Sequence, residues 1–171
     1  MKIGIMGGTF NPIHNAHLLI AEMAREEYGL DRVIFITDGN PPHKSANVTA
    51  KQRFEMTHIA IADNSAFEED DFEINRSEKS YTVNTLGYLK EKYPNKNVWA
   101  FTGYIYDKDL IPGGRKYTKD TDPLLDMIDV LVDGPFVEEL KDITLKFRGS
   151  SNQRLLDLKK TREHGKIVMQ F

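Results

Sequence analysis

Apolar and polar positions in the N-terminal half follow two alternating spacings. Short apolar runs are typical of buried parallel strands, whereas apolar residues recurring every three or four positions are typical of helices packed on a sheet. Gly29 is the expected residue just beyond the end of the first helix, and Thr49 is the expected N-cap of the second. The predicted order is strand 2–6, helix 15–29, strand 33–36 and helix 50–63.

The alternation of strands and helices continues along the rest of the chain. We expect a strand at 72–75, a helix from Ser80 or Thr82 through Tyr93, a strand at 97–101, a short helix or turn at 122–128, a strand at 130–132, and further strands at 155–158 and 167–169. The acidic run at 68–71 and the segment at 112–115 are interpreted as loops, with a metal site and an anion site as the respective alternatives. The crossovers are long enough for parallel pairing. The sequence therefore predicts an α/β fold: one domain over residues 1–171, with a Rossmann-like, doubly wound, mostly parallel sheet of five or more strands.

Composition narrows the class of protein. The net charge of −3, from 23 basic and 26 acidic residues, gives no bulk attraction to nucleic acid or to a membrane. No apolar run approaches the roughly 20 residues of a membrane span. The chain opens as a strand instead of a signal peptide, so a cytoplasmic protein is expected. The chain contains no cysteine, which excludes disulfides, thiolate metal sites and cysteine-ligated iron–sulfur clusters.

The most informative stretch is residues 6–17, Met-Gly-Gly-Thr-Phe-Asn-Pro-Ile-His-Asn-Ala-His, between the first strand and the first helix. Gly7 and Gly8 allow the backbone to approach a ligand closely, and a helix N-terminus presents free N–H groups to phosphate. His14 and His17 share a helix face and can donate to phosphate oxygens on which charge develops during nucleotidyl transfer. The structural alternatives are a tight turn and ordinary surface or capping histidines.

These residues resemble the G-G-T-F-[ND]-P-x-H-x-[GA]-H signature of the nucleotidyltransferase superfamily. Residues 1–97 resemble bacterial nicotinate-nucleotide adenylyltransferase in particular, with further matching segments at 41–44, 53–56 and 80–85. The resemblance implies that nicotinate mononucleotide and ATP are joined to form deamido-NAD and pyrophosphate, with Mg²⁺ bound alongside ATP mainly by phosphates and water. It implies catalytic roles for His14, His17 and Lys44, and no metal held by the protein itself. It implies nucleotide-binding roles for Gly7, Gly8, Thr9, Phe10, Asn11, His43, Arg53, Ser80, Tyr81, Thr82 and Gly103.

The adenylyltransferase pattern stops after the strand at 97–101. It calls for Gly-x-Asp, but here Gly103 is followed by Ile105 at the position of the acid. The later Ser-x-Thr phosphate clamp is also missing, and the segment 150–154 resembles it only superficially, because its arginine comes one residue too early. What the pattern uses to close over the two substrates is therefore absent or replaced.

Residues 95–171 instead resemble the C-terminal part of the radical-SAM activating protein of anaerobic ribonucleotide reductase, through the segments 132–136 and 148–154. Radical-SAM chemistry requires a cysteine-ligated cluster, so this chain cannot perform it. We interpret the chain as a chimera in which a nucleotidyltransferase-like half, 1–97, is joined to a foreign segment, 98–171, that completes the sheet.

Three functional hypotheses remain open. The first is an adenylyltransferase with weak or lost activity. The second is a nucleotide-binding module without turnover, because half of the phosphate clamp is missing. The third is an inactive recombinant fold or a partner-binding remnant of the activating protein. An exposed sheet edge in any of them favours a homodimer.

Overall fold

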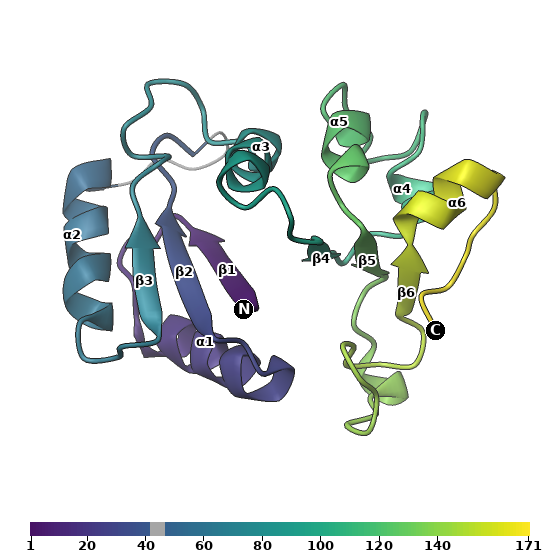
Figure 1. The fold of residues 1–171 in the computed structure, drawn as a ribbon, viewed down its shortest axis with the longest axis horizontal. Coiled ribbons are helices and arrows are strands. Elements are labelled where there is room, and N and C mark those ends of the chain that lie inside the picture. The colour runs from purple at the N-terminus through teal and green to yellow at the C-terminus, as the bar shows by residue number, and fades with distance from the viewer. Residues whose placement is uncertain (42–46) are drawn as a thin grey trace. The chain divides into compact units, whose positions relative to one another are not determined.

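The computed structural model describes residues 1–41 and 47–171 (Figure 1). The chain forms two compact units, residues 1–81 and 82–171, and each contains a three-stranded sheet. The predicted α/β class and mostly parallel pairing are confirmed. Among the described residues, the strands of each unit are hydrogen-bonded into a sheet of three. A single domain over residues 1–171 stays a prediction.

The N-terminal unit is a parallel sheet flanked by two helices. Its strand order is β1-β2-β3, and both strand pairs are parallel. Helix α2 packs along β2 and β3 (Figure 1). Its elements are β1 (Ile3–Gly8), α1 (Asn15–Tyr28), β2 (Arg32–Thr37), α2 (Ala50–Ile61) and β3 (Phe67–Asp70). The core consists of Phe10, Ile13, Ala21, Val33, Phe35, Ile61 and Phe67.

The predicted helix ends are confirmed by the cap geometry. Gly29 adopts a left-handed conformation with φ of 59°, and its N–H caps the last turn of α1. Thr49 precedes α2 in extended conformation, and its hydroxyl accepts the N–H of Gln52 at 3.2 Å. These local signals fix where α1 ends and where α2 begins.

The third strand lies elsewhere than predicted. Strand β3 includes part of the acidic run that we expected to be a loop, and the expected strand at 72–75 forms turns. Acidic residues fit here because a partner neutralises them: the Glu68 carboxylate pairs with Arg32 of β2 at 2.7 Å. Phe67 pairs in register with Val33 and buries its ring. One buried aromatic ring and one cross-strand ion pair therefore favour pairing over solvation.

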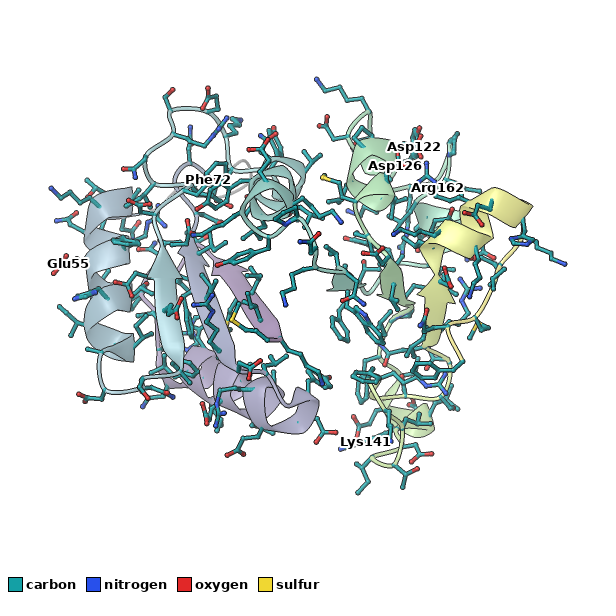
Figure 2. The ribbon with its side chains drawn as sticks, in the orientation of Figure 1. Glu55, Phe72, Asp122, Asp126, Lys141 and Arg162 are labelled. Atoms are coloured by element: carbon teal, nitrogen blue, oxygen red, sulfur yellow. The ribbon has the colours of Figure 1, made fainter. Side chains whose placement is uncertain are left out.

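The C-terminal unit is a mixed sheet of order β4-β5-β6, with β4 parallel and β6 antiparallel to β5. Arg162 of α6 points toward Asp126 of α5, and the two form an ion pair at 2.8 Å (Figure 2). The elements are α3 (Thr82–Lys92), β4 (Trp99–Phe101), α4 (Tyr106–Asp109), α5 (Thr121–Asp126), β5 (Val130–Asp133), the 3₁₀ turn η1 (Glu138–Leu140), β6 (Arg154–Asp157) and α6 (Leu158–His164).

The two strands predicted near the C-terminus are only partly right. Strand β6 ends at Asp157, because the carboxylate of Asp157 accepts the Lys160 N–H at 3.0 Å and starts α6. The segment 167–169 contributes a single bridge between Leu156 and Met169. Within the described part of the chain, no helix is both long and apolar enough to span a membrane.

Candidate functional site

The glycine-rich turn lies at the carboxyl end of β1. Gly7 and Gly8 are the last residues of that strand, and Gly8 pairs in register with Thr37, the last residue of β2. The N–H of Asp38 donates to the Gly8 carbonyl at 2.9 Å, so the loop after β2 begins beside the turn. Open parallel sheets place ligand sites at this edge.

The two glycines have different roles. A Cβ on Gly8 would approach the Phe10 ring to 2.8 Å, so the residue must stay small for the ring to pack. A Cβ on Gly7 would meet nothing within 4 Å. The Gly7 backbone therefore borders open space at the carboxyl edge, where another molecule can approach it closely.

Several backbone donors around this turn have no acceptor among the described residues. No described residue accepts a hydrogen bond from the N–H groups of Phe10 and Asn11, or from those of Asn15 and Ala16 in the first turn of α1. The α1 donors are the expected orphans of a helix N-terminus. A turn and a helix start that both offer N–H groups suit an anion.

His14 and His17 stand together at the start of α1. His14 is the N-cap residue, and its backbone N–H donates to Nδ1 of His17 at 3.2 Å. The two rings stack, with centroids 3.7 Å apart, and the His17 and Phe10 rings are nearly perpendicular, with centroids 5.2 Å apart. Because Nδ1 of His17 accepts, the neutral ring carries its proton on Nε2, where it can donate to a ligand.

The electrostatics of this pair suit an anionic partner. Partial burial lowers the pKa of His17, and the neighbouring His14 lowers it further. Both effects penalise a positive charge on the free ring. A phosphate placed against the ring would oppose them, so binding of an anion and protonation of His17 are coupled.

A network of hydrogen bonds joins the turn to the loop after β2. The Thr9 hydroxyl donates to Asp38 at 3.1 Å. Arg53 of α2, only 1% exposed, donates from its guanidinium to the carbonyls of Thr9 and Gly39. The Ser80 hydroxyl accepts the Gly39 N–H at 3.1 Å. The two loops are thus held by side chains from α2 and from the segment before α3.

The structure unites most, not all, of the predicted site residues. The turn, the histidine pair, Arg53 and Ser80 belong to one unit, and Tyr81, 42% exposed, ends it. Thr82 is the first residue of α3 and Gly103 follows β4, so both belong to the other unit. His43 and Lys44 lie outside the described residues.

Two residues of this site were missed by the sequence analysis. Asp38 and Gly39 were not among the predicted site residues, yet they connect to Thr9, Arg53 and Ser80. Their position directly after a buried parallel strand was the available signal. No cluster of three or more histidine or carboxylate side chains among residues 1–41 and 47–171 is arranged to hold a metal ion.

Comparison with known proteins identifies a family that matches most of this chain. The model of the family described as cytidylyltransferase-like matches residues 5–141. The chain is 54% identical over 104 residues to a "Probable nicotinate-nucleotide adenylyltransferase" of Desulfitobacterium hafniense, a match that covers 60% of this chain and 50% of the relative. It is 51% identical over 105 residues to a protein of the same name from Pelobacter propionicus, covering 60% and 49%. The chain thus spans about half the length of the curated relatives it matches.

Two solved structures share the fold. Both are Plasmodium falciparum nicotinic acid mononucleotide adenylyltransferase, one complexed with NaAD and one with APC. The first has a TM-score of 0.54 at 20% identity and covers 81% of this chain and 77% of its own. The second has a TM-score of 0.51 at 17% identity and covers 96% of both chains. The family match also continues beyond residue 97, and these findings give no support to the predicted second family over residues 95–171.

Proposed function

The chain belongs to the cytidylyltransferase-like family, and from that premise we propose that its N-terminal unit binds the phosphates of ATP and nicotinate mononucleotide. The reaction class is adenylyl transfer to nicotinate mononucleotide, giving deamido-NAD and pyrophosphate. The observation that carries the proposal is the set of N–H donors around the turn that no described residue accepts, together with the stacked histidines, at the carboxyl edge of parallel strands. The names of the curated relatives point to the same substrates.

The chemistry needs no protein nucleophile. A phosphate oxygen of the mononucleotide attacks the α-phosphorus of ATP, the new P–O bond forms, and the bond to the pyrophosphate leaving group breaks. His14 and His17 donate to the phosphate oxygens on which charge accumulates, and the free N–H groups of Phe10 and Asn11 hold the same anion. Gly7 lets the phosphate approach the backbone.

The remaining site residues enter by resemblance. We infer that Lys44 neutralises the triphosphate and that His43 binds the nucleotide. Ser80, Tyr81 and Thr82 are assigned to the side of the pyridine nucleotide, and Gly103 to the glycine of the family's next motif. Mg²⁺ enters as the complex with ATP and is held mainly by phosphates and water.

We further propose that turnover is weak. Ile105 stands where the family pattern has an acid, and the two acids that follow are already engaged. Asp107 pairs with Arg154 at 2.8 Å, and Asp109 pairs with Arg115 at 2.6 Å. Positioning supplies most of the catalysis in phosphoryl chemistry, so a missing clamp lowers the rate more than it lowers binding. A nucleotide-binding module without turnover is the second candidate, and it rests on the same observation.

The test is product formation by the full chain. We expect slow release of pyrophosphate, with formation of deamido-NAD, from nicotinate mononucleotide and Mg·ATP. His17→Ala should abolish it, whereas His58→Ala should not, because His58 is an exposed histidine of α2 paired with Glu69. Nucleotide binding without product would select the binding module. Absence of both would leave the predicted chimera and the predicted homodimer as the accounts still to be tested.

A further inference from the structure

Arg53 is a buried cation directly behind the glycine-rich turn. It lies in the first turn of α2 with 1% exposure, and its two terminal nitrogens donate to different loops. One donates to the Thr9 carbonyl, and the other donates to the Gly39 carbonyl at 3.2 Å. These carbonyls follow β1 and β2, so one side chain spans the carboxyl ends of two neighbouring strands.

The surroundings of Arg53 keep its guanidinium in this place. Burial lowers the pKa of Arg53, and the opposite charge of Asp38 counters that effect. Asp38 also accepts the Thr9 hydroxyl at 3.1 Å. On α2, the Thr57 hydroxyl donates to the Arg53 carbonyl at 3.0 Å. Thr9 is therefore held twice, through its carbonyl and through its side chain.

The hydrogen bond to Thr9 determines where a neighbouring donor points. In a trans peptide the C=O and the following N–H point in opposite directions. The cis peptide of this turn is Asn11–Pro12, so the Thr9–Phe10 peptide obeys the trans rule. With the Thr9 carbonyl directed at Arg53, the Phe10 N–H is directed away from it, and no described residue accepts that N–H.

Phe10 itself has a conformation that needs support. Its φ of 44° lies in the left-handed region that residues with a side chain rarely adopt. Such a conformation persists when the surroundings fix it. The buried Phe10 ring fixes the side-chain end, and the bond from Arg53 to Thr9 fixes the peptide before it.

We propose that Arg53 is a positioning residue for the phosphate site, acting through the Thr9 and Gly39 carbonyls without touching the nucleotide. It sets the spacing of the two loops and aims the Phe10 N–H at the phosphate. The inference rests on the proposed function, and it gives Arg53 a role different from the direct nucleotide contact that the family resemblance implies.

The experiment compares Arg53→Lys and Arg53→Met with the wild-type chain, using Arg25→Met as a matched control on the same unit. Arg25 pairs with Glu22 on α1, and in the described part of the chain it is not among the residues bonded to Thr9 or Gly39. Two quantities are measured on the full chain: the amide ¹H–¹⁵N resonance of Phe10 without ligand, and the Kd for pyrophosphate. Circular dichroism checks that each variant is folded.

We expect both Arg53 variants to shift the ligand-free Phe10 amide, because a lysine carries its donors on one nitrogen and lacks the fork that reaches both carbonyls, and a methionine donates to neither. With the Phe10 N–H no longer aimed at the phosphate, one hydrogen bond to the ligand is lost, and pyrophosphate binding should weaken about tenfold. Arg25→Met should leave both quantities at their wild-type values. If Arg53→Met does not fold, Arg53→Lys retains the charge and still breaks the two-carbonyl bridge.

Two results separate the claims. A Phe10 amide unchanged in Arg53→Lys would overturn the positioning role, and weakened binding without that shift would indicate direct contact with the ligand. Failure of the wild-type chain to bind pyrophosphate would instead overturn the proposed function. The ligand-free Phe10 resonance would still test the link from Arg53 to the turn.

Discussion

Gly39, in the loop after β2, is closely surrounded by backbone atoms. A Cβ built there would lie 2.0 Å from the carbonyl oxygen of Glu73 and 2.7 Å from its carbonyl carbon. The Gly39 N–H is bound to Ser80 and its carbonyl is bound to Arg53, so the residue cannot move aside without breaking one of these bonds. Gly39→Ala therefore forces a displacement of backbone.

The loss of folding stability in Gly39→Ala depends on which atoms must move to make room for the new methyl group. Overpacking a well-packed site costs about 1–3 kcal/mol, and the upper end applies where the obstacle is backbone instead of a flexible side-chain end. We expect Gly39→Ala to lower the free energy of unfolding by about 3 kcal/mol, a large share of the stability of an ordinary domain. Gly7→Ala is the matched control, because its Cβ meets nothing within 4 Å. Its expected change is about 0.5 kcal/mol or less.

The assay is urea unfolding followed by circular dichroism at 222 nm, with hydrogen exchange to locate the loss in the N-terminal unit. Exchange should accelerate in the loop after β2 and around Glu73 in Gly39→Ala alone. Equal unfolding midpoints for Gly39→Ala and Gly7→Ala would refute the reasoning. In ligand binding the order should be reversed: Gly7→Ala should weaken binding more than Gly39→Ala, because the Gly7→Ala methyl group enters the open space assigned to the phosphate.

Three further outcomes follow from the charges and caps. In NMR titrations the pKa of His17 should lie below 6.5, because of partial burial and then His14, and pyrophosphate should raise it. Because the unfolded chain takes up the proton at a higher pH than the folded chain, the stability that neutral His17 contributes is lost as pH falls from 6.5 to the folded-state pKa. His17→Gln should remove this pH dependence of the urea unfolding midpoint. Thr49→Ala should lower the free energy of unfolding by about 1 kcal/mol in urea, through loss of the cap. Arg115 lowers the pKa of Asp109 from its ordinary value of 3.8. The stability that the Asp109 carboxylate contributes should therefore be present above pH 3.8 and lost as pH falls through the lowered pKa. Urea unfolding midpoints of Asp109→Asn should not show this loss at acid pH.

The sequence predicted best where the signal is local. β1 and β2 follow from short apolar runs, and the limits of α1 and α2 follow from Gly29 and Thr49. The two histidines lie together, as predicted, because a three-residue spacing from an N-cap into a helix needs no knowledge of the rest of the fold.

The errors arise where distant partners decide. Strand β3 is acidic, and nothing local announces that Arg32 neutralises Glu68 across the strand pair. The end of β6 depends on Asp157 turning to cap α6, which overrides an apolar pattern that continued through Leu158. The bonds from Arg53 were equally hidden, because their acceptors are backbone carbonyls of two loops remote in sequence. An arginine near a helix start is more often interpreted as a ligand contact or a solvated side chain.

The central claim is that the turn over residues 7–17 is a working phosphate site. The most direct test is isothermal titration of Mg·ATP, and separately of nicotinate mononucleotide, into the full chain and into His17→Ala. The account predicts saturable one-to-one binding by the wild-type chain that His17→Ala weakens at least tenfold, the loss expected when a hydrogen bond to a charged phosphate is removed. No heat of binding from either nucleotide, with a chain that unfolds cooperatively, would contradict it.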